Sequence, residues 1–129
     1  MKVHIQIDNS SNDPLYLQIK NQLKASIIAG DLSPGEKLPS IRFLSKELRI
    51  SMITSKRAFD ELEKEGFIHS VQGKGNFVAS QNKELIREEY LKKIEENIQE
   101  ILKLAYTIDL SIDEIIAMIE NMEGDEYDS

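Results

Sequence analysis

Two short helix-forming runs follow one another almost without a break in the stretch PSIRFLSKELRISMITSKR, residues 39–57. Ser40 and Ser51 each precede one of these runs. Serine is a preferred N-cap because its hydroxyl accepts a hydrogen bond from a backbone N–H of the first turn. Since only a few residues separate the end of the first run from Ser51, the two helices must meet at a steep angle. The pattern is typical of a helix-turn-helix.

Three helices are predicted in this part of the chain, over residues 14–29, 41–48 and 52–65. Asp13 as N-cap and Pro14 at the first helical position would begin the first helix, and Gly30 would end it. On the third helix one side is predicted to be buried, because its members recur at helical spacing. That side consists of Ser55, Ala58, Phe59 and Leu62.

Two β-type runs follow the third helix, over residues 67–71 and 76–79, and QGKG joins them. Gly73 and Gly75 can adopt positive φ, and Lys74 stands between them at the tip of the predicted hairpin. Such a tip lets backbone N–H groups and one cation approach a phosphate or a minor groove. A hairpin directly after a helix-turn-helix is typical of a wing. The predicted fold class is mainly α with a small β-hairpin.

The net charge of −7 conceals a difference between the two ends of the chain. Residues 1–80 carry 11 Lys and Arg and 9 Asp and Glu, a net charge of +2, whereas residues 81–129 carry 5 and 14, a net charge of −9. A nucleic-acid site is therefore expected only before residue 80. The chain has no cysteine, no secretory signal pattern and no apolar run long enough for a membrane span, so we expect a cytoplasmic protein without membrane partners.

From Pro14 to Ala79 the chain resembles the winged helix-turn-helix domain of GntR-family bacterial transcription factors. The resemblance rests on PLYLQIKNQLKASIIAGDLSPGEKLPSIRFLSKELRIS, AFDELEKEGFI and QGKGNFV, in that order. The helical tail that follows resembles the YtrA-type subfamily. This resemblance implies a DNA-binding regulator, most often a repressor, that controls transporter or cell-envelope stress genes.

The resemblance also implies which residues contact DNA. Together with the exposed cations of the third helix, the candidate DNA-binding residues are Ser40, Arg42, Ser51, Met52, Thr54, Lys56, Arg57, Gly73 and Lys74. Met52 departs from relatives, which often carry a polar or basic residue there; it cannot form a bidentate contact with guanine, but its thioether could pack on a thymine methyl.

Several of these candidates have another interpretation. Ser40 and Ser51 are first of all N-caps, Arg42 could pair with Glu47, and Arg57 could be a solvated surface residue. Asp60 lies one turn beyond Lys56, so we expect only the first turns of the helix to approach DNA closely.

The acidic tail is predicted to form a long amphipathic helix over residues 82–107 and a second helix after a capping box of Ser111 and Glu114. Two such helices cannot bury their apolar faces alone, whereas pairing with the same hairpin of a second subunit would bury them. The candidate dimer interface consists of Ile86, Tyr90, Ile94, Ile98, Ile101, Ile108, Ile112, Ile115, Ile116 and Ile119. Packing of the tail against the winged domain is the alternative.

These observations predict a winged helix-turn-helix DNA-binding domain over residues 1–80 and a helical dimerisation domain with an acidic tail over residues 81–129. The predicted function is a homodimeric, sequence-specific transcriptional repressor that binds an inverted-repeat operator in double-stranded DNA and associates with the nucleoid when bound. An unknown small-molecule effector, if one exists, would occupy a dimer crevice or the hinge near Ser80. No cofactor is expected, and His4 and His69 lack companions at metal-ligand spacing.

The sequence leaves two rival functions to compare with this prediction. In the first, the winged domain is a structural platform and the acidic helices bind a protein partner. The second is an enzyme, which the sequence does not favour, because it contains no Gly-rich nucleotide loop, histidine-bearing triad or paired-carboxylate signature.

Overall fold

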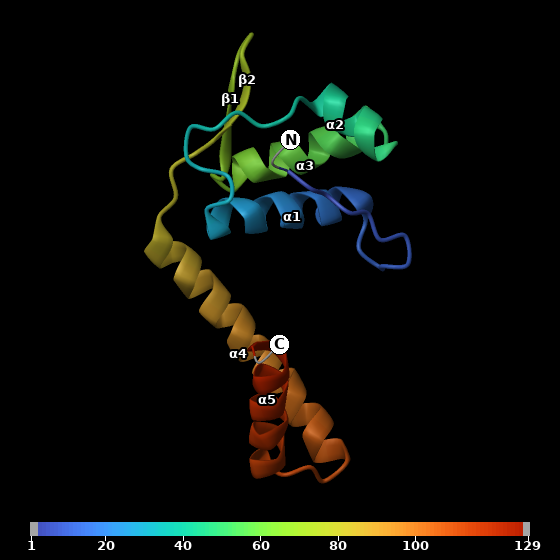
Figure 1. Ribbon diagram of the computed structural model, residues 1–129, viewed down its shortest axis with the longest axis vertical. Helices are drawn as coiled ribbons and strands as arrows, with labels where there is room; N and C mark the ends of the chain where they lie inside the picture. The colour runs from blue at the N-terminus through green and yellow to red at the C-terminus, as the bar shows by residue number, and fades with distance from the viewer. Residues whose placement is uncertain (1–2, 128–129) are drawn as a thin grey trace. The chain divides into compact units, whose positions relative to one another are not determined.

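The computed structural model describes residues 3–127, with side chains through residue 124 (Figure 1). In chain order its elements are α1 (Leu15–Ala29), α2 (Ile41–Leu48), α3 (Met52–Lys64), β1 (Ile68–Val71), β2 (Gly75–Val78), α4 (Lys83–Thr107) and α5 (Ile112–Tyr127). The chain divides into two compact units, with the boundary in the sequence between Lys83 and Glu84. The first unit is a winged helix-turn-helix, so the predicted fold class is confirmed.

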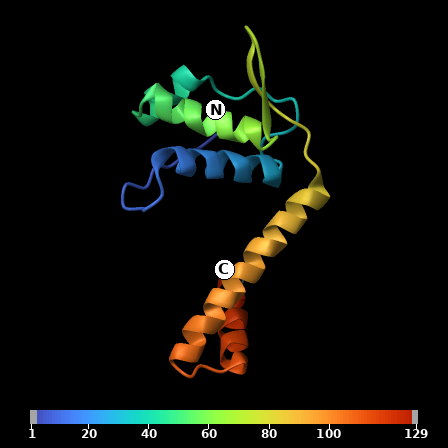
Figure 2. The same ribbon diagram turned by 180° about the vertical axis from the view of Figure 1, so that it is seen from behind.

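The core of the first unit lies where α1 and α2 pack on α3. In both views α1 and α3 lie side by side (Figure 1, Figure 2). The fully buried side chains that join the three helices are Ile19, Leu23, Leu44, Ala58, Phe59 and Leu62. The stripe that helical spacing predicts on α3 is therefore the buried one, and the opposite face of α3 is left free.

The two serine caps fix the turn between α2 and α3. Ser40 Oγ accepts a hydrogen bond from the Phe43 N–H at 3.0 Å, and Ser51 Oγ accepts one from the Thr54 N–H at 3.1 Å. Between the helices Arg49 adopts a left-handed conformation with φ 56°, which reverses the chain within three residues. Both predicted caps are confirmed.

The predicted start of α1 is wrong by one residue. Pro14, with ψ 154°, is the N-cap, and no side chain caps the helix, so Asp13 does not have the predicted role. The reason is a side chain farther along: Gln18 Nε2 donates to the Asp13 carbonyl at 2.9 Å and to the Asp8 carbonyl at 3.1 Å. These bonds hold the turn of residues 8–13 against the start of α1. Gly30, with φ 87°, ends the helix as predicted.

The hairpin forms the wing and is tied to the helix-turn-helix. Its antiparallel strands pair Ile68 with Val78 and Val71 with Gly75. β1 begins one residue later than predicted, and β2 lies one residue earlier than the predicted run 76–79. The loop before α2 runs along β2, since the Leu38 N–H donates to the Asn76 carbonyl at 2.9 Å and the Val78 N–H donates to the Glu36 carbonyl at 2.9 Å. The hairpin projects beyond the three helices (Figure 1).

The second unit consists of α4 and α5. The predicted capping box is present at the start of α5: the Glu114 N–H donates to Ser111 Oγ at 3.1 Å, and the Ser111 N–H donates to Glu114 Oε2 at 2.8 Å. Among the side chains described in this unit, Ala105 is the buried one. None of the helices in the described part of the chain is both long and apolar enough to cross a bilayer.

Candidate DNA interface

The free face of α3 carries the candidate contacts of the helix-turn-helix. Ile53 is 82% exposed and Met52 is 53% exposed. The side chains of Lys56 and Arg57 are 65% and 61% exposed. Because the core holds the opposite side of α3, these residues form one continuous outer surface. A helix with cations near its N-terminal end suits entry into a major groove.

Lys56 is paired with a carboxylate on its own helix. Its Nζ lies 2.8 Å from Asp60 Oδ2, one turn farther along α3. An exposed pair at this spacing contributes only about 0.3–0.5 kcal/mol, so a phosphate could replace the carboxylate at low cost. An ammonium also has three donors, so Lys56 could keep Asp60 and still contact DNA.

Arg57 is held more firmly than a solvated arginine. Its Cζ lies 3.7 Å from the centre of the Tyr16 ring, and its Nε lies 3.4 Å from Glu61 Oε2. The sequence suggests Arg57 as a DNA contact or a surface residue, and the structure adds two partners that anchor it. Tyr16 belongs to α1, so this contact crosses between helices.

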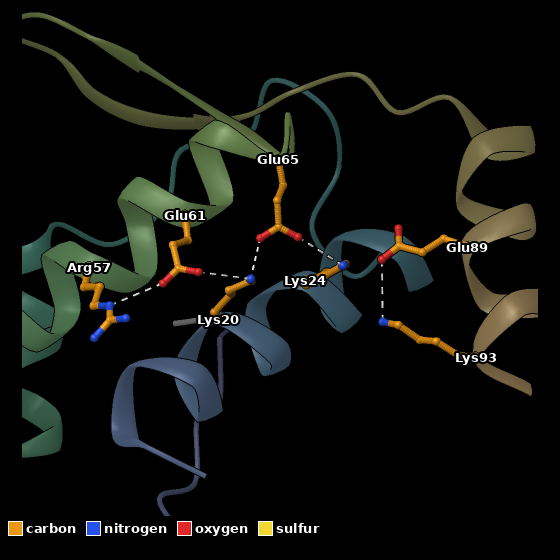
Figure 3. A network of polar contacts seen from close by, with 7 residues as sticks. All are labelled: Lys20, Lys24, Arg57, Glu61, Glu65, Glu89 and Lys93. Carbon is orange, nitrogen blue, oxygen red and sulfur yellow. Dashed lines mark hydrogen bonds and ion pairs between the residues drawn. The ribbon is translucent and has the colours of Figure 1, made fainter. Parts of the chain in front are cut away.

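An ionic network that continues from Arg57 through Glu61 joins α1 to α3 (Figure 3). Lys20 Nζ lies 3.4 Å from Glu61 Oε1 and also pairs with Glu65, while Lys24 Nζ lies 3.4 Å from Glu65 Oε1. The hydrogen bond with Glu65 raises the pKa of Lys20 and outweighs the opposing effect of burial. The network fixes the positions of Glu61 and Glu65 on the side of α3 next to α1.

The remaining helix-turn-helix candidates lie at helix N-termini. Arg42 is exposed in the first turn of α2, and among the described side chains it forms no ion pair, so the alternative pairing with Glu47 is not observed. The hydroxyls of Ser51 and Thr54 bond to each other at 2.7 Å. Helix N-termini favour anions, so these residues lie where a phosphate would be stabilised.

The wing places its candidates at the tip of the hairpin. Gly73 has φ 76°, a conformation that side chains rarely adopt, so glycine is required there by the backbone. The Lys74 N–H donates to the Val71 carbonyl at 2.9 Å, which closes the turn, and the Lys74 side chain is exposed. The turn therefore presents one cation.

A buried hydroxyl pair lies where α2 crosses α3. Ser45 Oγ and Ser55 Oγ are 2.8 Å apart, and Ser45 Oγ also donates to the Ile41 carbonyl at 2.8 Å. The helical spacing predicts Ser55 on the buried side, but the sequence does not indicate its partner, because the two serines are ten residues apart on different helices. The sequence gives no sign of the contact between Tyr16 and Arg57 either, because it joins two different helices. Among these additional contacts, the ion pair of Arg57 with Glu61 could have been predicted from the sequence, because the two residues are four positions apart on one helix.

In the part of the chain that the structure describes, no cluster of His, Asp or Glu is arranged to hold a metal ion. The site is thus a set of cations, hydroxyls and backbone donors on α2, α3 and the wing. Such groups bind polyanions through charge and hydrogen bonds.

Comparison with known proteins connects this unit to a family. Residues 15–78 match the model of the family described as bacterial regulatory proteins, gntR family. The HTH-type transcriptional repressor YtrA of Bacillus subtilis (strain 168) is 31% identical over 121 residues, which cover 94% of this chain and 93% of that protein.

Two solved structures extend the comparison. A GntR family transcriptional regulator from Listeria monocytogenes is similar with a TM-score of 0.71 and 27% identity, over 89% of this chain and 98% of that chain. The AraR(DBD) in complex with operator ORR3 is similar with a TM-score of 0.51 and 31% identity, over 57% of this chain and 89% of that chain. The relatives are transcription regulators rather than enzymes, as the sequence predicts. Because a repressor this similar covers nearly the full length of both chains, and the family model matches the winged unit, the chain belongs to the gntR family of bacterial regulatory proteins.

Proposed function

We propose that this protein is a sequence-specific DNA-binding transcriptional repressor that inserts the N-terminal half of α3 into the major groove. The observation that carries the proposal is the free face of α3, where Lys56 and Arg57 are exposed opposite the core. The similar AraR structure, solved with an operator, supports the same use of the winged unit. Arg42, Ser40 and Ser51 would contact phosphates or bases at the helix N-termini.

The wing would add a second contact next to the groove that α3 occupies. Gly73 and Lys74 at its tip would meet the DNA backbone or the minor groove. The segment before α2 is hydrogen-bonded to β2, so wing and helix-turn-helix would bind as one rigid body. The net charge of +2 over residues 1–80 allows this approach, and the −9 of residues 81–129 disfavours DNA contact by the tail.

We further propose that α4 and α5 join two chains into a homodimer. At 100° per residue, the candidate interface residues of α4 cover an arc of about 120° and those of α5 an arc of about 100°, which is wider than a strict coiled-coil seam. Most of the candidate interface is exposed in a single chain, for instance Ile94 at 52% and Ile112 at 64%. Ile86 and Ile115 are half-buried. A four-helix arrangement of two hairpins would cover these faces.

Two linked winged units would read two half-sites. For a two-fold dimer these lie about 34 Å apart or a small multiple of that, so the operator would be an inverted repeat. Linkage also multiplies modest half-site affinities through effective concentration. We propose that the protein is cytoplasmic and represses an operon that includes its own gene, together with transporter or cell-envelope stress genes.

The test is a footprint on the DNA upstream of the protein's own gene. Wild type should protect an inverted repeat, and Lys56→Ala should weaken protection about tenfold, since a well-placed contact contributes about 1–3 kcal/mol. Lys92→Ala is the matched control, because it removes the same charge from an exposed position on α4. Wild-type affinity should fall steeply with salt.

Two results would contradict the proposal. Equal footprints for wild type and Lys56→Ala would exclude the proposed role of α3. Duplex binding that is absent, or that does not respond to salt, would favour the rival function of a protein-interaction platform.

A further inference from the structure

The guanidinium of Arg57 has two contacts, one on its face and one at Nε, and within the described part of the chain its two Nη groups are left without a partner. Its face lies on the Tyr16 ring, with Cζ 3.7 Å from the ring centre, and its Nε is 3.4 Å from Glu61 Oε2. In Figure 3 the dashed line to Glu61 starts from one nitrogen of the guanidinium, and no dashed line reaches the other two. Among the described side chains no other partner of this guanidinium is found. Four of its five N–H donors therefore remain available.

The carboxylate that holds Arg57 is itself held in place. Glu61 uses Oε2 for Arg57 and Oε1 for Lys20, whose Nζ is 3.4 Å away. The Lys20 side chain is only 14% exposed and also pairs with Glu65, so it is fixed on α1. Arg57 is thus oriented by a chain of contacts that begins in the interior, unlike a surface ion pair between two mobile side chains.

The location of Arg57 favours a phosphate as its ligand. Its contact with Tyr16 places it on the side of α3 that faces α1, beside the centre of the free face where Ile53 projects. When a helix occupies a groove about 12 Å wide, residues at its sides meet the phosphates of the groove wall. A guanidinium presenting both Nη groups matches two phosphate oxygens in a bidentate contact.

We propose that Tyr16 and Glu61 are positioning residues that hold Arg57 as a preformed clamp for one DNA phosphate at the edge of the major groove. The inference rests on the proposed function, in which α3 enters that groove. Because the guanidinium is already ordered, less side-chain freedom is lost on binding. α1, which is otherwise a core helix, would thereby contribute to DNA affinity through Tyr16.

The experiment measures affinity for the operator and for an unrelated duplex across a range of salt concentrations. Arg57→Ala should weaken binding to both duplexes by a similar factor, about tenfold, and should lower the salt slope by about one per subunit, as expected for a lost phosphate contact. Arg57→Lys should stay closer to Arg57→Ala than to wild type, because an ammonium cannot stack or form the fork. Lys64→Ala controls for the loss of one charge from the same helix.

The positioning role of Tyr16 is tested by two substitutions, one that removes the aromatic ring and one that keeps it. Tyr16→Leu should weaken binding to both duplexes about threefold, and Tyr16→Phe, which keeps the stacking surface, should restore most of the affinity. In the Arg57→Ala background, Tyr16→Leu should have almost no further effect, because the two residues act as one unit. Thermal unfolding of each variant separates these effects from a loss of folded protein.

Each alternative outcome is decisive. Equal affinities for Tyr16→Leu and Tyr16→Phe, or a full effect of Tyr16→Leu in the Arg57→Ala background, would overturn the positioning role. A loss by Arg57→Ala confined to the operator would show a base contact and overturn the phosphate clamp. If Tyr16→Leu does not fold, wild-type affinity in Arg57→Lys overturns the proposal by itself.

The same series separates this inference from the proposed function. Weakened binding by Lys56→Ala combined with normal binding by Arg57→Ala would overturn the clamp and leave the role of α3 intact. Normal binding by both variants would contradict the proposed role of α3 in DNA binding and, with it, the phosphate clamp.

Discussion

The two units of this chain differ in how completely they bury their apolar side chains. In the first, every helix buries a stripe in a shared core, with Phe59 and Leu62 of α3 at 2% and 0% exposure. In the second, α4 and α5 leave long apolar stripes exposed, and Ala105 is the buried side chain among those described. The comparison teaches that one chain completes the winged unit, whereas α4 and α5 need another surface. DNA binding and assembly would therefore be separable properties.

The strongest way to break this comparison is to place charge on the exposed stripe of α4. Ile94→Asp combined with Ile98→Asp should dissociate the proposed dimer, because burying unpaired carboxylates costs far more than the interface can supply. Sedimentation should show a monomer, and circular dichroism should show lost helix. Lys92→Asp, outside the stripe, is the control. A double variant that stays dimeric would contradict the assigned interface.

The second prediction tests whether the winged unit can be destabilised without loss of the proposed dimer. Phe59→Ala should destabilise that unit by about 3–5 kcal/mol, because it removes an aromatic side chain from a closed core. Denaturant unfolding should show the winged transition shift while the dimer persists in sedimentation. If both units unfolded together in this variant, they would not be energetically separate.

The third prediction concerns the hydroxyl pair at the crossing of α2 and α3. Ser45→Ala should destabilise the winged unit by about 1–3 kcal/mol, because it leaves the buried Ser55 hydroxyl without its partner. The double variant Ser45→Ala with Ser55→Ala should recover part of that loss, as measured by denaturant midpoint. A double variant that is less stable than the single variant would show that the hydroxyls matter for another reason.

The smallest predicted effect is a pH dependence confined to the first unit. The pKa of Lys20 is raised, first by its hydrogen bond with Glu65. The contribution of the charged Lys20 to folding stability is therefore complete below its unfolded-state pKa, and it is lost as the pH rises through the higher folded-state pKa. The denaturant midpoint of the winged unit should fall above about pH 10.4, the ordinary lysine pKa, and the fall should be shallower in Lys20→Met. Identical pH profiles for wild type and Lys20→Met would contradict the assignment.

Sequence reasoning succeeds here where the deciding contacts are local. The caps at Ser40, Ser51 and Ser111 each involve a partner three residues away, and the structure confirms all three. The buried stripe of α3 follows from helical spacing alone.

The predictions failed, or were never made, where partners are distant in the sequence. Asp13 does not cap α1; its backbone carbonyl instead accepts a hydrogen bond from the Gln18 amide, which also binds the backbone at Asp8. Tyr16 and Arg57 meet only because α1 packs on α3, and no periodicity encodes that contact. For the candidate site, the sequence identifies the cations, but the contacts that orient them depend on tertiary packing.

The account depends most on two winged units acting together on one duplex. The direct measurement is the mass, by sedimentation, of the complex with a duplex that carries the inverted repeat from upstream of the protein's own gene. The account predicts two chains per duplex at physiological salt and much weaker binding when one half-site is scrambled. One chain per duplex, or equal affinity for the intact and the scrambled repeat, would contradict it.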